Sequence, residues 1–301
     1  MLCRKPFVKA DAAYGCGQCI PCRINKRREW THRIMLEAAQ YKSNCFVTLT
    51  YDKEHLPNDG SLRPEHFRNF LKRLRFNIAP ARLRYFGVGE YGDNSFRPHY
   101  HLALFNYPGC RYGLSRYGRD CHSCCTACDT IRDTWGNGFV GVGTLTSDSA
   151  QYLAGYVTKK MTGKDDERLA GRYPEFARMS LKPGIGASAT WELADYYLTW
   201  GKNQPDVPGA LRHGRRILPL GRYLRRLTRA RAGLSDGSAP QATLDEQKAR
   251  LQTLWSAAVA IAPGNRSLQE LNFGNLITKA YEGKANALAN RSRIFKKRNT
   301  L

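Results

Sequence analysis

The chain has 301 residues, of which 48 are Lys or Arg and 25 are Asp or Glu, so its formal net charge at pH 7 is +23. Hydrophobic residues make up 42% of the sequence, enough for at least one buried core, which argues against wholesale disorder. The longest nearly apolar run, residues 254–262, is far shorter than the ~18–20 residues that a membrane span needs, and the amino terminus lacks the apolar segment of a secretory signal. We therefore expect a cytoplasmic protein with no membrane contact and a polyanionic partner.

Helices and strands are predicted to alternate in the first half of the chain. Residues 23–41 contain no Pro or Gly and many basic side chains, which is typical of a helix with a positive face. The β-branched and aromatic run 45–51 predicts a strand, and residues 61–77 predict an amphipathic basic helix. Two further strand-like runs, 83–91 and 97–105, flank a turn composition and predict an antiparallel hairpin.

The remaining elements complete an α+β fold with a central antiparallel sheet and a mainly helical carboxy-terminal region. We place the catalytic domain at residues 1–162 and a basic, DNA-binding accessory region at residues 163–301. In chain order these elements are a cysteine-rich insert at 108–128, a short helix at 130–135, a strand at 138–145, and helices at 147–162, 187–202, 242–262 and 267–293.

Two histidines in the hairpin are candidate ligands of a divalent metal ion. His99 and His101 are two residues apart on a strand, so their side chains point to one face, ~6–7 Å apart. Glu90 lies on the partner strand, where the hairpin can bring its carboxylate beside the imidazoles. Such a set can hold Mg²⁺ or Mn²⁺ and leave positions for water or a phosphate oxygen. The alternative is that the two histidines simply line a polar surface.

Paired tyrosines follow on a predicted helix. Tyr152 and Tyr156 are at i and i+4, on one helix face. Lys159 and Lys160 come next, and an ammonium group near Tyr156 can stabilise a phenolate or a phosphate. A tyrosine needs such help to act as a nucleophile, because its ordinary pKa is about 10. The alternative is that both tyrosines are core residues.

Cysteines cluster twice, which is what a metal site needs. In a reducing compartment thiols or metal thiolates are favoured over disulfides, so each cluster predicts a structural Zn²⁺ site. Disulfides, unligated thiols and, for the first cluster, an iron–sulfur centre are the alternatives. The first cluster is Cys3, Cys16, Cys19 and Cys22; the second is Cys110, Cys121, Cys124, Cys125 and Cys128, with His122 as a substitute ligand.

The order of these motifs resembles that of a known family. The strand FVTLTYD at 46–52, the His-Tyr-His at 99–101 and YLAGYVTKK at 152–160 follow one another like the three motifs of HUH rolling-circle replication initiators. They are similar to those of the replication initiation protein of the Microviridae, in the gokushovirus branch, where an early CxxCxxCR segment, GEYG before RPHYH, and GYVTKK recur together. The resemblance covers most of residues 1–160 and extends to the MSxxPGIG-like stretch at 179–186.

This resemblance implies an RRM-like HUH endonuclease domain that nicks and joins DNA. A metal ion on His99, His101 and Glu90 would polarise the scissile phosphate, and a tyrosine would attack it to form a 5′-phosphotyrosine and a free 3′-OH. Tyr156 is expected to initiate, because Lys159 follows it by three residues.

In Tyr152 the equivalent position is Gly155, so this tyrosine departs from the full pattern. The implied partners are single-stranded phage origin DNA, the duplex replicative form, and a host helicase and DNA polymerase, in the host bacterial cytoplasm.

Two other functions stay open at this point. One is an HUH relaxase or transposase with the same chemistry; the other is a non-enzymatic, zinc-stabilised nucleic-acid-binding protein. Arginines at 212–231 and the basic tail at 291–298 predict phosphate contacts, with a solvated surface as the alternative. The aromatic residues of the 187–202 helix predict either helical core or stacking on unpaired bases; they are Trp191, Tyr196, Tyr197 and Trp200.

Overall fold

The computed structural model of the chain contains two compact units. One unit is Arg27–Trp191, and the other combines Met1–Lys26 with Glu192–Leu301. The predicted functional boundary at residue 162 stays a prediction. The structure describes residues 3, 7–9, 12–92, 95–112, 124–158, 167–201, 203–261, 283–288 and 290.

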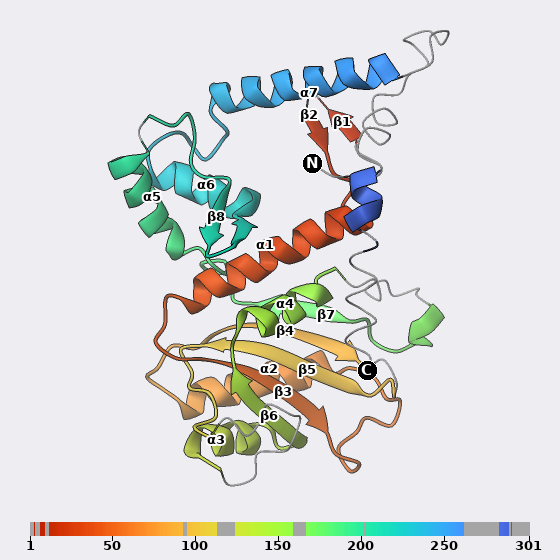
Figure 1. Ribbon diagram of the computed structural model, residues 1–301. Coiled ribbons are helices and arrows are strands. Elements are labelled where there is room, and N and C mark those ends of the chain that lie inside the picture. Colours follow the sequence, from red (N-terminus) through yellow and green to blue (C-terminus); the bar gives the residue numbers. More distant parts are fainter. Residues whose placement is uncertain are drawn as a thin grey trace. The chain divides into compact units, whose positions relative to one another are not determined.

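Five antiparallel strands form the central sheet of the Arg27–Trp191 unit, in the order β6-β3-β5-β4-β7 (Figure 1). The predicted α+β fold around an antiparallel sheet is confirmed. The fifth strand, β7, lies outside the predicted elements, because four residues are too few to show a strand period. The bounds are β3 (Asn44–Tyr51), β4 (Arg84–Tyr91), β5 (Pro98–Phe105), β6 (Gly138–Thr144) and β7 (Phe176–Met179).

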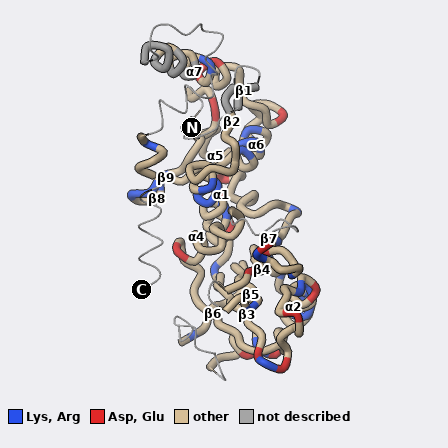
Figure 2. Tube along the Cα trace, turned by 90° about the vertical axis from the view of Figure 1, so that its right-hand side faces the viewer, with Lys and Arg blue, Asp and Glu red and all other residues tan. Residues whose placement is uncertain are grey.

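Each face of this sheet is covered by different helices. α2 (Pro64–Asn77) and α3 (Thr126–Trp135) pack on one face, which we call the α2 face, and α4 (Ser147–Tyr156) lies on the other, which we call the α4 face (Figures 1 and 2). Because side chains alternate along a strand, the register assigns every sheet residue to one face. The α4 face carries Phe46, Thr48, Thr50, Phe86, Val88, Glu90, His99, His101, Ala103, Phe105, Phe139, Gly141 and Gly143.

The α2 face holds the larger aromatic core. Phe67 and Phe70 of α2 are buried there together with Trp135 at the end of α3. Burial of such a side chain stabilises the fold by roughly 1.5–3 kcal/mol. The Trp135 indole N–H also donates a 3.2 Å hydrogen bond to the carbonyl of Thr50, which ties α3 to β3.

On the α4 face, α4 packs against the sheet beside α1 (Ile20–Ala38). Thr146 caps α4: its side chain accepts from the amide of Ser149 at 3.2 Å, and the Ser149 hydroxyl accepts from the amide of Thr146 at 2.8 Å. α4 ends at Tyr156, before the predicted end at residue 162; residues 159–162 lie outside the described residues.

A buried carboxylate fixes α1 to the loop after β7. Glu37 on α1 is fully buried and accepts hydrogen bonds from the Arg84 guanidinium and, at 2.7 Å, from the amide of Gly186. Arg33, one turn earlier, donates to the carbonyl of Ile185 at 3.0 Å. Because a buried charge is stable only with such partners, these bonds specify where the loop sits on α1.

The other unit is built from two short hairpins and three helices. Asp206 is its electrostatic centre, because it accepts hydrogen bonds from both Arg225 and Arg229 of α6. None of its helices within the described range 203–261 is long and apolar enough to cross a membrane, and the same holds for the described residues elsewhere. The elements are β1 (Phe7–Lys9), β2 (Ala12–Tyr14), α5 (Ala189–Trp200), β8 (Ala210–His213), β9 (Arg216–Pro219), α6 (Gly221–Arg231) and α7 (Gln241–Ile261).

The aromatic residues of α5 divide in an unexpected way. Tyr197 is buried, as the helical-core interpretation predicts, and its hydroxyl donates to the carbonyl of Gln204 at 2.8 Å. Trp191, Tyr196 and Trp200 are exposed, so the core interpretation is wrong for these three. Most of the predicted helix at 267–293 lies outside the described residues; 283–288 and 290 are helical.

Gly138 provides a test of the sheet's edge. Its φ is +132°, and a Cβ built on it would lie 2.2 Å from the amide nitrogen of Asp52. We expect Gly138→Ala to lower the free energy of unfolding by about 2 kcal/mol or more. Gly143→Ala in the same strand is the control, because its Cβ meets no atom of the described residues closer than 4.0 Å. Urea denaturation measures both, and equal midpoints would contradict this account.

Candidate functional site

Strand register brings the predicted metal ligands onto one patch of the α4 face. Glu90 of β4 is directly opposite His99 of β5, and His101 follows two residues later on the same face. The Nε2 atom of His101 donates a 2.8 Å hydrogen bond to Oε1 of Glu90. Both side chains are buried, so this pair is shielded from bulk water and its electrostatic interaction is strong.

Hydrogen bonds orient both imidazole rings. The Nδ1 atom of His99 is 2.7 Å from the carbonyl of Arg97, which can only accept, so Nδ1 carries the proton and Nε2 keeps its lone pair. His101 Nδ1 is 3.0 Å from the Thr48 hydroxyl, which can donate or accept and so serves either tautomer. The two rings are parallel within 2°, with centroids 6.4 Å apart, as the strand spacing predicts.

Burial lowers the pKa of His99, and the nearby His101 lowers it further. The carbonyl of Arg97 acts in the opposite direction but does not outweigh burial. His99 is therefore held in the neutral form, which is the form that binds a metal ion.

The two tyrosines of α4 complete the site through their hydroxyls. Tyr156 donates a 2.7 Å hydrogen bond to the hydroxyl of Tyr152, and Tyr152 donates to Oε1 of Glu90 at 3.0 Å. The Tyr152 hydroxyl is also 3.4 Å from Nε2 of His101. The i, i+4 spacing thus aligns both phenols with the Glu90–His101 pair in one continuous chain of hydrogen bonds.

Burial raises the pKa of Tyr156, and the negative charge of Glu90 and the contact with Tyr152 raise it further. The Tyr156 phenol is therefore neutral at physiological pH and must lose its proton during any reaction in which it attacks. Lys159 and Lys160, the predicted sources of positive charge, lie outside the described residues.

The donor set fits a hard divalent cation in chemistry, although its ligand atoms do not all converge. An imidazole lone pair, a second imidazole and a carboxylate are suitable ligands for Mg²⁺ or Mn²⁺. Glu90 and His101 are already in contact, and His99 lies one strand register away. Within the described residues, the sets whose ligand atoms all lie within 4.8 Å of one another are the two cysteine groups.

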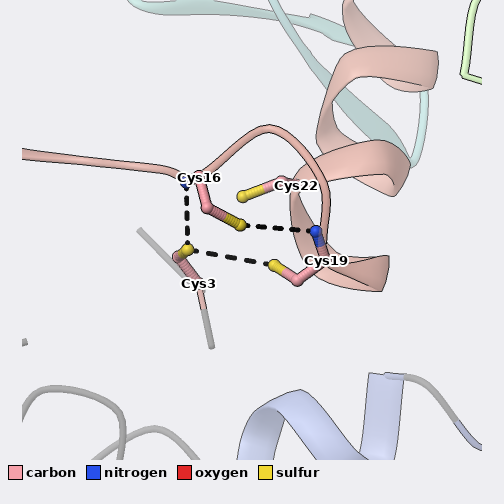
Figure 3. Close-up of side chains that lie close together, drawn as sticks. All are labelled: Cys3, Cys16, Cys19 and Cys22. Carbon is pink, nitrogen blue, oxygen red and sulfur yellow. Dashed lines mark hydrogen bonds between the residues drawn. The ribbon is translucent and has the colours of Figure 1, made fainter. Parts of the chain in front are cut away.

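The first cysteine group has the dimensions of a zinc site (Figure 3). Its members are Cys3, Cys16, Cys19 and Cys22, and their sulfur atoms lie within 4.8 Å of one another. The Cys3 and Cys19 sulfurs are 3.8 Å apart, the separation of about 3.8 Å that a tetrahedron with Zn–S bonds of about 2.3 Å requires. Burial raises the pKa of the Cys16 thiol, but hydrogen bonds from backbone amides outweigh it and lower the pKa to about 7.

The second group lies where β5 and α3 meet. Cys110, Cys124, Cys125 and Cys128 converge, with neighbouring sulfur–sulfur distances of 3.7, 4.0 and 3.5 Å. Both predicted groups could therefore hold a metal ion, and no disulfide joins the cysteines that the structure describes. Cys121 and His122, the other predicted ligands, lie outside the described residues.

The family of the sheet segment follows from its sequence. Residues 44–161 match the family model described as replication-associated protein ORF2. This range includes the strands and the helix that supply Glu90, His99, His101, Tyr152 and Tyr156. Residues 44–161 belong to this family. The predicted resemblance to replication proteins of small phages is thereby confirmed.

Three phage proteins of the same description are similar to the chain. Replication-associated protein VP4 of Bdellovibrio phage phiMH2K is 36% identical over 168 residues, 52% of this chain and 52% of that protein. ORF2 of Spiroplasma virus 4 is 38% identical over 179 residues, 57% and 55% of the two chains. ORF4 of Chlamydia phage 1 is 30% identical over 151 residues, 48% and 38%. The chain thus spans about half the length of these relatives or less, and no solved structure matches it.

Two residues of the site lie outside the sequence-based prediction. Thr48 contacts His101 by a hydrogen bond, and the Phe46 ring stacks on the His101 ring with centroids 5.7 Å apart. Both lie in the predicted strand at 45–51, and their even spacing puts them on one face. The missing information is the strand pairing: β3 lies beside β5 although more than forty residues of sequence separate Thr48 from His101.

Metal analysis tests the cysteine groups. We expect the purified chain to hold about two zinc ions, and Cys19→Ser and Cys128→Ser each to remove about one of them, because a tetrahedral site tolerates the loss of a thiolate poorly. Cys45→Ser is the matched control, since Cys45 is buried in the core away from both groups. Plasma mass spectrometry gives the stoichiometry. Unchanged zinc content in Cys19→Ser would contradict the first site.

Proposed function

We propose that the chain is the replication initiator of a small single-stranded DNA phage, acting in the cytoplasm of the host bacterium. It nicks one DNA strand at the phage origin and rejoins it through a 5′-phosphotyrosine intermediate. The observation that supports this most is the hydrogen-bonded chain from Tyr156 through Tyr152 to the Glu90–His101 pair. This chain of contacts lies inside the segment that belongs to the replication-associated protein family.

In the proposed reaction the hydroxyl oxygen of Tyr156 attacks the scissile phosphorus. The new bond joins this oxygen to phosphorus, and the bond from phosphorus to the 3′ oxygen breaks. The phosphate stays on the tyrosine as a diester, so its energy is conserved and the reverse attack by a 3′-OH joins the strand without ATP. Tyr152 makes the second attack, when a regenerated origin is cleaved while the first tyrosine still holds DNA.

The same hydrogen bonds support a route for the proton. The Tyr156 hydroxyl donates to Tyr152, which donates to Oε1 of Glu90. As Tyr156 attacks, its proton moves to Tyr152 while the Tyr152 proton moves to Glu90, where it is available for the leaving 3′ oxygen. This relay matters because burial makes the Tyr156 phenol hard to ionise by itself.

His99, His101 and Glu90 are the residues that would hold a divalent ion, Mg²⁺ or Mn²⁺. Such an ion, when bound, withdraws charge from the scissile phosphate. The chain's own contribution is to hold the imidazoles in place, through the Arg97 carbonyl for His99 and the Thr48 hydroxyl for His101. The released 3′-OH primes a host DNA polymerase, and a host helicase opens the duplex ahead of it.

Adduct formation tests the nucleophile. We expect the native chain, incubated with Mg²⁺ or Mn²⁺ and single-stranded oligonucleotides that tile the genome encoding it, to form a covalent protein–DNA adduct on a denaturing gel. Tyr156→Phe should lose the adduct by a factor of about 10³ or more, because the attacking oxygen is absent.

Tyr173→Phe is the control for this experiment, since Tyr173 is an exposed tyrosine of the same unit outside α4. An undiminished adduct in Tyr156→Phe would overturn the assignment of Tyr156. Absence of an adduct with the native chain, across both metals and all oligonucleotides, would overturn the enzymatic function and favour a binding protein.

A second surface supports contact with duplex DNA. On α6, Arg222 and Arg226 are exposed one turn apart, whereas Arg225 and Arg229 are drawn inward by Asp206 (Figure 2). Exposed arginines release counterions when they meet phosphates, whereas arginines already paired with a carboxylate contribute little. We propose that the exposed pair holds the duplex replicative form.

Salt dependence distinguishes these two pairs of arginines. We expect the double variant Arg222→Gln/Arg226→Gln to reduce the slope of log K against log salt for duplex DNA by about 0.9 per arginine. Its circular dichroism spectrum and melting temperature should be unchanged, because both side chains are exposed. Fluorescence anisotropy with a labelled duplex gives the slope. A slope equal to that of the native chain would show that this surface is not used.

A further inference from the structure

Phe139 on β6 is a large apolar side chain that the fold leaves half exposed on the α4 face, at 50% relative exposure. Strand register places it in one row with the proposed catalytic residues: Phe139 is opposite Thr50, Thr50 is opposite His99, and His99 is opposite Glu90. Exposure rises along this row, from buried Glu90 through half-buried His99 and Thr50 to exposed Phe139. The open end of the site therefore carries an aromatic ring.

The distance from this ring to the chemistry is set by strand spacing. β6 lies two strands from β5, which corresponds to about 10 Å at about 4.8 Å per strand. Since duplex DNA advances about 3.4 Å per nucleotide and an extended single strand advances more, the ring is within about three nucleotides of a phosphate at His99.

Phe139 is also held rigidly. The turn before it contains two glycines with positive φ, Gly136 at +61° and Gly138 at +132°, and the carbonyl of Asn137 accepts from the amide of Asp52 at 3.1 Å. A Cβ on Gly138 would collide with the backbone at the end of β3, so the turn fits there only as glycine. A ring fixed before a ligand arrives loses little entropy on binding.

Beside Phe139, β6 presents bare backbone to the α4 face. Gly141 is opposite Thr48, and Gly143 is opposite Phe46, so both glycines share the face of the Phe139 ring. Glycine weakens a strand interior and often marks a close approach by a ligand or another backbone. At Gly143 a Cβ would meet no described atom closer than 4.0 Å, so packing within the described residues does not require glycine there.

We propose that Phe139 and the glycine face of β6 bind unpaired bases of the DNA strand next to the scissile phosphate, with one base stacked on the Phe139 ring. The inference rests on the proposed function, because it gives the substrate strand a path from His99 across β3 to the sheet edge. Stacking on an aromatic ring requires an unpaired base and tolerates any base. The surface therefore selects single-stranded over duplex DNA without reading sequence.

A binding assay without divalent metal tests this surface independently of the cleavage chemistry. The probe is a fluorescein-labelled oligothymidylate of about 20 nucleotides, and its anisotropy is measured against native chain and variants. We expect Phe139→Leu, which keeps an apolar side chain of similar size, to weaken binding about 5- to 100-fold. Phe139→Tyr should restore affinity to within about threefold, because it keeps the ring.

Two further variants make the assay specific. Gly143→Leu should also weaken binding, about 5-fold or more, because its side chain stands on the proposed path while the fold has room for it. Phe76→Leu is the matched control: Phe76 is 83% exposed at the end of α2, the helix that covers the opposite face. Its affinity should equal that of the native chain. A labelled duplex should bind Phe139→Leu and native chain equally.

Several results would overturn the proposal. They are oligothymidylate affinity of Phe139→Leu within twofold of native, an equal loss in Phe76→Leu, an equal loss for duplex, or no binding of oligothymidylate by the native chain. Failure of the proposed function is distinguishable, because it is read from the covalent adduct. A chain that forms the adduct normally but shows no Phe139 effect would keep the nicking function and lose this binding surface.

Discussion

The pairing register of β4 with β5 is the constraint on which the site depends. A shift by one residue would move Glu90 to the opposite face from His99 and His101, because side chains alternate along a strand. The α2 face prevents such a shift. A Cβ on Gly87 would lie 2.6 Å from the Phe67 ring, and one on Gly89 would lie 2.7 Å from the Phe176 ring, so two aromatic rings occupy the space above two glycines. The buried core of one face thereby holds the polar residues of the other in position.

The tyrosine helix depends on the same sheet in a second way. α4 packs through Ala150, Leu153 and Ala154 against the apolar end of the α4 face, so Tyr152 and Tyr156 reach over its polar end. α1 covers the same apolar cluster, and the Glu37 carboxylate joins α1 to both β4 and the loop at Gly186. A carboxylate far from the chemistry therefore helps to fix the surface on which the hydroxyl chain is built. This arrangement explains why residues after 162 belong to the same compact unit as the proposed catalytic residues.

Local patterns in the sequence predict the parts of this site that are close along the chain. The hairpin, the same-face histidines and the i, i+4 tyrosines follow from periods of two and 3.6 residues, and the structure has all three arrangements. The contact of His101 with Thr48 and the edge pairing of β7 depend on long-range strand order, which no local period contains. Asp206 is a similar case: nothing local indicates that one carboxylate neutralises two of the eight arginines between 212 and 231.

Net charge alone does not determine which basic surface meets DNA. The charge of +23 would attract any polyanion. Paired arginines such as Arg229 already have a carboxylate partner, so phosphate would have to displace Asp206 at the cost of leaving a buried carboxylate unpaired. Exposed arginines such as Arg226 meet no such cost. On the sheet, by contrast, the open end of the α4 face carries Thr50 and Phe139 rather than a cationic side chain, so specificity for an unpaired strand there must come from stacking and shape. Charge would bring the nucleic acid to the protein, and the uncharged edge of the sheet would choose the strand that reaches the tyrosines.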